Sequence, residues 1–126
     1  MKTSISPMRK ATFIILAIVL LLSGVAHLFY AEFYAAMIPD IFPETLVNIS
    51  FGIIELAIGV GFLLKNFQRQ AAMAFTVLMV VFLPIHIWDA AKEVPAIGSP
   101  LIAYIRIGFQ LFLIYTGYWL AKGQAN

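Results

Sequence analysis

The sequence predicts an all-α protein, a four-transmembrane-helix bundle with both termini cytoplasmic. The chain of 126 residues is 63% hydrophobic and only 11% charged, with a mean hydropathy of +0.97, whereas an ordinary soluble domain carries about 25% charged residues. Four apolar runs are each close to the ~20 residues that a helix needs to cross the ~30 Å hydrocarbon core of a bilayer. We therefore expect an integral membrane protein with a single domain, residues 1–126.

The helices are expected at about residues 11–30, 46–64, 71–90 and 101–121. Pro39 interrupts the first connection, residues 65–69, of which four are polar, form the second, and Pro95 interrupts the third. Transmembrane strands would need alternating polarity, and these runs are apolar on nearly every face. Four helices are therefore expected instead of a membrane barrel.

The first run follows basic residues and ends near Gly24-Val25-Ala26-His27, an order that is also found in cleavable secretory signals. We expect it to remain as a transmembrane helix, because its removal would leave three spans with their ends on opposite sides of the membrane. Ser23 and His27 lie one turn apart on this helix, so they share its polar face.

The second run carries a single stripe of small and polar side chains. Asn48, Gly52, Glu55 and Gly59 follow one another at helical spacing, so they lie on one face. Small residues let neighbouring helices approach closely. Glu55 would lie about 13 Å from the outer start of the helix, near the membrane midplane.

The third run contains Pro84, which should kink the helix and free the backbone carbonyl four residues earlier. His86, Asp89 and Glu93 form a polar stripe at its end.

In the fourth run, Arg106 and Gln110 are one turn apart. Each run thus carries an ionisable or imidazole side chain, and a central acidic or basic residue costs about 2.5–3.5 kcal/mol on insertion scales. Such residues face one another or water. We expect a shared polar cavity in the outer half of the bundle, with Arg106 as the counter-charge of Glu55. The expected cavity residues are His27, Glu55, His86, Arg106 and Gln110.

The charges predict the orientation. Basic residues gather on one side of the predicted topology, at Lys2, Arg9, Lys10, Lys65, Arg69 and Lys122. The opposite connections hold Glu32, Asp40, Glu44, Asp89 and Glu93 against a single Lys92. Because basic residues near segment ends mark the cytoplasmic side, both termini are expected inside. We expect the protein in the bacterial cytoplasmic (inner) membrane.

The connection from Glu32 to Glu44 is too apolar for a free loop, since it contains Phe33, Tyr34 and Met37 among other apolar residues. It is expected to lie in the outer interface or over the bundle as a lid.

The polar residues have more than one interpretation. A buried polar core can simply fix helix register as interhelical glue. His27, His86 and Glu55 match a two-histidine, one-carboxylate metal set in residue type. The sequence has no local ligand pair and no cysteine, so we expect no metal, and the sequence identifies no other cofactor. It cannot decide whether Glu55 pairs with Arg106 or acts in a proton path.

Short motifs in a fixed order resemble the DoxX-like family of small four-helix integral membrane proteins over nearly the whole chain. They are Ser23-Gly24-Val25-Ala26-His27-Leu28-Phe29, Phe33, Ile38-Pro39, Phe42-Pro43, Gly52-Ile53-Ile54-Glu55, Gly59, Phe82-Leu83-Pro84-Ile85-His86-Ile87, Arg106 and Gln110. Two departures are His86, where the family usually has asparagine, and Leu28, which separates His27 from Phe29. The resemblance implies functional residues at His27, Glu55, the stretch 82–87, Arg106 and Gln110.

The resemblance implies a broad range of functions. Members of the family are linked to quinone-coupled sulfur oxidation, to membrane oxidoreductase complexes and, in a distant animal branch, to assembly of ligand-gated channels. We expect an accessory subunit or a binder of a small apolar or quinone-like ligand. The alternative is an assembly factor or adaptor for a partner membrane protein, with a purely structural polar core. An enzyme that uses Glu55, His27 or His86 as acid or base ranks lowest. The lipid bilayer is an expected partner and nucleic acid is not.

Overall fold

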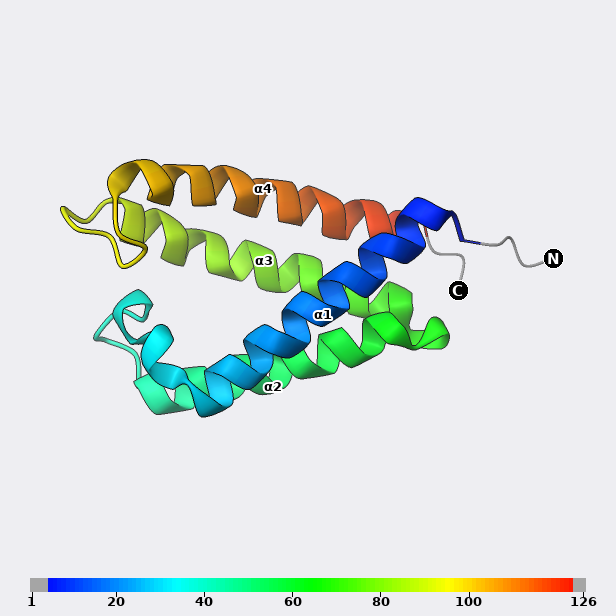
Figure 1. Ribbon diagram of the computed structural model, residues 1–126, viewed down its shortest axis with the longest axis horizontal. Coiled ribbons are helices and arrows are strands. Elements are labelled where there is room, and N and C mark those ends of the chain that lie inside the picture. The colour runs from blue at the N-terminus through cyan, green and yellow to red at the C-terminus, as the bar shows by residue number, and fades with distance from the viewer. Residues whose placement is uncertain (1–4, 124–126) are drawn as a thin grey trace.

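The computed structural model describes residues 5–123, which form four long α-helices (Figure 1). They are α1 (Pro7–Phe29), α2 (Glu44–Leu63), α3 (Gln68–Ala90) and α4 (Pro100–Lys122). The short 3₁₀ turns are η1 (Ala31–Phe33), η2 (Ala35–Met37) and η3 (Lys65–Phe67). Residues 5–123 contain no strand, and all four long segments are long and apolar enough to cross a membrane. The predicted all-α, four-helix architecture is therefore confirmed.

Helix α1 begins a turn earlier than predicted because a serine-proline pair starts it. The Ser6 hydroxyl oxygen accepts a hydrogen bond from the backbone N–H of Arg9 at 3.2 Å, and Pro7 is the first helical residue. A serine cap satisfies an N–H that the first turn leaves free, and a proline in that turn loses no helical bond. Ser99 and Pro100 start α4 in the same way.

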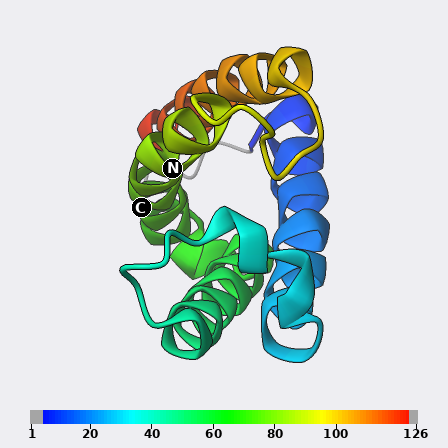
Figure 2. The ribbon, with the colours of Figure 1, turned by 90° about the vertical axis from the view of Figure 1, so that its left-hand side faces the viewer.

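The helices pair as two hairpins, α1 with α2 and α3 with α4, and most of the packing lies within each hairpin. A Cβ on Gly24 would lie 2.9 Å from the carbonyl oxygen of Gly52, so the absence of side chains here lets α1 approach α2 closely. Figure 2 shows the four helices arranged in a ring in chain order. Where Arg9 donates to the carbonyl of Trp119, α1 lies close to α4, and the two helices diverge toward the other end of the bundle (Figure 1).

The two ends of the bundle have different contents. At the terminal end, where α1 begins and α4 ends, aromatic side chains from three helices pack into an apolar core. The ring centroid of Phe62 lies 5.3 Å from that of Phe13 and 5.6 Å from that of Phe75. The opposite end, the loop end, carries the α1–α2 and α3–α4 connections. It also holds most of the buried polar side chains, so we looked for the functional site there.

The predicted stripe on α2 is confirmed. Asn48, Gly52, Glu55 and Gly59 are all buried, and together they form the polar and small face that α2 turns toward the rest of the bundle. Asn48 and Glu55 are only 2% and 3% exposed. The glycines of the stripe allow close packing against α1, and the two polar residues therefore reach the interior.

Candidate functional site

A cavity of about 800 Å³ lies between the two hairpins, a volume within the usual range of small-ligand sites. All four helices contribute polar side chains to its lining, most of them toward the loop end: Ser23, His27, Glu55, His86 and Gln110. Four of the five residues expected in the cavity are thus brought together. The fifth, Arg106, does not line the cavity.

His27 connects α1 to two polar residues of α2. Its Nδ1 lies 2.9 Å from Asn48 Oδ1, and its Nε2 lies 3.7 Å from Glu55 Oε1. Because the asparagine oxygen accepts from Nδ1–H, Nε2 faces the carboxyl group. His27 thus joins α1 to α2 through one hydrogen bond and one close polar contact at the cavity wall.

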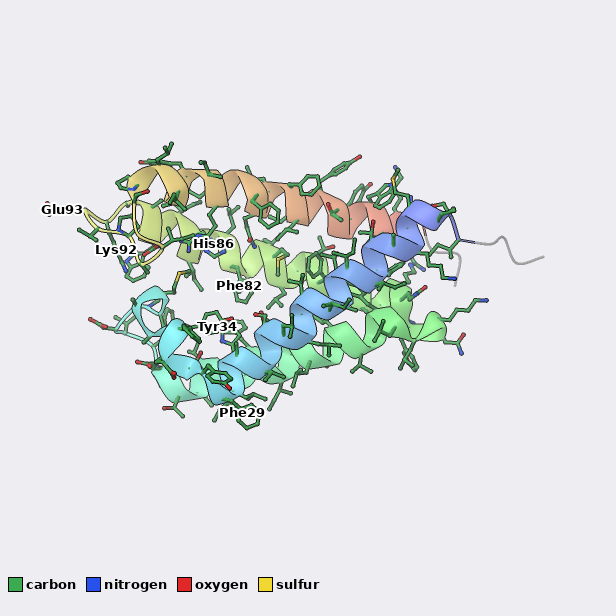
Figure 3. The ribbon with its side chains drawn as sticks, viewed as in Figure 1. Phe29, Tyr34, Phe82, His86, Lys92 and Glu93 are labelled. Atoms are coloured by element: carbon green, nitrogen blue, oxygen red, sulfur yellow. The ribbon has the colours of Figure 1, made fainter. Side chains whose placement is uncertain are left out.

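Tyr34 covers His27 from the α1–α2 connection. The two rings stack with centroids 3.7 Å apart and planes 16° apart, and the Tyr34 hydroxyl lies 3.2 Å from that of Ser23. Figure 3 shows Tyr34 between the hairpins, whereas Phe29 points away from the bundle. Met37 and Ile38 also line the cavity. The connection thus covers part of the loop end, as expected for a lid. The importance of Tyr34 was missed because an aromatic near a helix end is usually an interfacial anchor.

Gln110 ties α4 to α3 at the level of the proline. Its Nε2 donates to the carbonyl of Met79 at 2.8 Å. Pro84 has no N–H to donate to the carbonyl of Val80, the next one along the helix. The hydrogen bond from Gln110 thus reaches α3 one residue before the carbonyl that Pro84 leaves free. The half-buried side chain of His86 lies close to Gln110, and His86 is two residues after Pro84 in α3.

The structure corrects the expected counter-charge of Arg106. Arg106 Nη2 donates to Asp89 Oδ2 at 2.8 Å, whereas Glu55 pairs with His27. Asp89 has no exposed surface, although its place near the end of the third apolar run suggested an acidic loop. It is buried because α3 continues to Ala90 and the following loop folds back onto it, with the Ala96 N–H donating to Asp89 Oδ1 at 2.8 Å.

Asp89, Lys92 and Arg106 form what we call the Asp89 cluster. Lys92 Nζ lies 3.2 Å from Asp89 Oδ1 and donates to the carbonyl of Ala36 at 2.9 Å. Arg106 Nη1 lies 3.0 Å from the sulfur of Met37. The cluster therefore attaches the α3–α4 hairpin to η2, through Ala36 and Met37. This half of the polar core matches the structural interpretation, in which polar contacts set helix register.

The buried polar side chains, including two that line the cavity, are not all fully hydrogen-bonded. Four buried side-chain atoms among the described residues lack a hydrogen-bond partner: Asn48 Nδ2, Glu55 Oε2, His86 Nδ1 and Arg106 Nε. Glu55 and His86 both line the cavity. An unsatisfied buried polar atom costs about 1–3 kcal/mol. Two of the four unpaired atoms thus belong to residues that line the cavity.

The described residues contain no group of three histidine, aspartate or glutamate side chains placed to hold a metal ion. His27 and Glu55 are close to each other, but His86 does not join them as a third ligand. The two-histidine, one-carboxylate set is thus not assembled in this geometry.

Exposed apolar side chains of α1 and α4 border the cavity. Ile15 and Val19 on α1 line it and are more than half exposed, as are Phe112 and Tyr115 on α4. These residues belong to α1 and α4, the two helices that diverge toward the loop end (Figure 1). In a bilayer, a gap with apolar borders faces lipid chains instead of water.

Comparison with known proteins identifies a family. A family model described as a domain of unknown function (DUF8561) matches residues 16–121, which include every cavity residue named above except Ile15. No curated protein and no solved structure shows significant similarity to the chain.

Proposed function

The chain belongs to the DUF8561 family, and from the geometry of its cavity we propose that it is a membrane protein that binds a small apolar or quinone-like ligand taken from the bilayer. The single observation that carries the proposal is the cavity of about 800 Å³ with unpaired polar atoms on Glu55 and His86. A mainly apolar pocket with a few convergent polar groups is the usual form of a small-ligand site. The proposed role is that of an accessory protein, not of a catalyst.

The ordered motifs support a relationship to DoxX-like proteins, which we keep as part of the proposal. His27, Glu55 and Gln110, which carry that resemblance, all line the cavity. Under this proposal Arg106 has a positioning role through Asp89. It holds the lid and the α3–α4 hairpin together and does not touch the ligand.

Ligand occupancy is tested by native mass spectrometry of protein extracted in membrane nanodiscs. We expect one small molecule per chain in the wild type. Val47→Phe, which places a larger side chain in the cavity lining, should remove most of it. Val77→Phe is the matched control because Val77 is 63% exposed and does not line the cavity. A wild-type protein without any bound molecule, or equal occupancy in both variants, would contradict the proposal.

We also propose that the terminal end faces the cytoplasm, in the inner membrane of a bacterium. Arg9, Lys10, Lys65, Arg69 and Lys122 belong to this end, and the positive-inside rule supports the assignment. Lys2, part of the same charge pattern, lies outside the described residues. The exposed acidic residues of the loop end would then face outward: Glu32, Asp40, Glu44 and Glu93.

The orientation can be measured by cysteine labelling, since the chain has no cysteine. Asp40→Cys should react with an impermeant maleimide in intact cells. Asn66→Cys, in η3 at the terminal end, should react only after permeabilisation. The reverse pattern would invert the topology and leave the cavity itself unchanged.

A further inference from the structure

The cavity is polar at one end and apolar at the other. In its terminal half the polar lining residues include Thr12 and Thr116, whose hydroxyls donate to the carbonyls of Met8 and Phe112 at 2.8 Å. Their donors are thus used within their own helices. The free polar groups lie toward the loop end, where Glu55 and His86 contribute unpaired atoms. Such a gradient fits a molecule with a polar head and an apolar tail.

The cavity is also long. It is lined along α1 from Met8 to His27, and at 1.5 Å per residue these positions are about 28 Å apart. A ligand the size of a single ring would fill only part of this length. One extended hydrocarbon chain parallel to the helices would contact the whole apolar lining, and it could enter through the gap between α1 and α4 without crossing water.

The free groups restrict the chemistry of the head. Glu55 Oε2 is an acceptor without a partner on a side chain that is 3% exposed. The Ser23 hydroxyl, which approaches this carboxyl group, is also within 3.2 Å of Tyr34. A head group that donates a hydrogen bond satisfies Oε2. While Glu55 is ionised, a second carboxylate beside it would repel it strongly at low dielectric, and an oxidised quinone ring offers only acceptors to Oε2.

We infer that the ligand is a single-chain lipid whose head donates a hydrogen bond and has no negative charge, such as a long-chain alcohol or a quinol. The inference rests on the proposed function and deepens it. The head binds Glu55 toward the loop end, and the chain extends between α1 and α4 toward Trp119, which lines the opposite end of the cavity.

Trp119 allows the position of the chain to be tested. The chain has two tryptophans, so Trp88→Phe leaves Trp119 as the sole reporter. The variant is placed in phosphatidylcholine nanodiscs and titrated with 16-bromohexadecan-1-ol, whose bromine quenches fluorescence at short range. We expect saturable quenching that unlabelled hexadecan-1-ol reverses. 2-Bromohexadecan-1-ol, with bromine near the head, should quench little, because its bromine would lie near the loop end.

Head chemistry is tested in the same protein with 16-bromohexadecanoic acid, which should bind at least about tenfold more weakly, the loss of roughly one hydrogen bond. Glu55→Leu should weaken binding of the alcohol by a similar factor, and its melting temperature shows whether it is folded. The comparison of acid with alcohol does not depend on that variant.

The outcomes separate this inference from the proposed function. Equal binding of acid and alcohol would overturn the head chemistry, and equal quenching by the two bromoalcohols would overturn the orientation of the chain. If no bromo-probe quenches Trp119 while native mass spectrometry finds a bound molecule, only the inference fails. If neither experiment detects a ligand, both fail.

Discussion

Asp89→Ala is expected to lower the free energy of unfolding by about 3–5 kcal/mol, the usual cost of breaking a buried ion pair from one side. Asp89 has no exposed surface, and Arg106, 2.8 Å away, has a side chain that is only 14% exposed. Without the carboxylate, the guanidinium stays buried without its counter-charge, and the Ala96 N–H loses its acceptor. The decrease in the free energy of unfolding is measured by equilibrium unfolding in mixed micelles with an increasing fraction of denaturing detergent.

The control for this substitution is Glu93→Ala, which removes an exposed carboxylate from the α3–α4 connection (Figure 3). It should change stability by less than about 0.5 kcal/mol, as surface substitutions usually do. The double variant Asp89→Leu/Arg106→Leu should be more stable than Asp89→Ala, because it leaves no unpaired charge. Similar losses for Asp89→Ala and Glu93→Ala would show that the Asp89 cluster does not hold the loop end together.

The four helices could be predicted because membrane helices are specified locally. Length and apolarity place each span, and proline or polar residues end it. The stripe from Asn48 to Gly59 was also visible, since the spacing of residues on one helix is fixed by its geometry. The early start of α1 was missed because Ser6 and Pro7 begin the helix through capping. A hydropathy pattern contains no information about caps.

Pairing between helices could not be predicted in the same way. Arg106 was assigned to Glu55 because both lie within apolar runs. Its actual partner depends on the rotation and axial offset of α3 relative to α4, which place Asp89 beside it. The divergence of α1 from α4 is likewise a property of packing. It follows from close contact at the terminal end and has no signature in either helix alone.

The buried polar residues have two separate roles in the structure. The Asp89 cluster is paired on nearly every atom and joins α3, α4 and the lid, as an assembly of structural contacts would. The polar residues on the cavity wall satisfy fewer of their hydrogen-bonding atoms. Glu55 Oε2 and His86 Nδ1 have no hydrogen-bond partner. Stability and binding should therefore respond to different substitutions.

The two histidines provide the second large test of this separation. His27→Phe keeps a ring of similar shape but removes both polar contacts of His27, leaving Asn48 Oδ1 and Glu55 Oε1 buried without their present partner. Each such group costs about 1–3 kcal/mol, so we expect a loss of about 2–4 kcal/mol in the same micelle experiment. Part of the loss should be recovered in His27→Phe/Asn48→Leu, which removes one of the two unpaired groups.

His86→Phe is the matched substitution, because His86 Nδ1 has no partner to lose and the ring is only half-buried. It should leave the unfolding free energy within about 1 kcal/mol of the wild type, because the half-buried ring loses only its contact with Gln110. The amount of bound small molecule in native mass spectrometry should nevertheless fall, since a polar group of the cavity wall is gone. If His86→Phe destabilised the protein as much as His27→Phe, His86 would be structural as His27 is, and its unpaired nitrogen would not set it apart as a binding group.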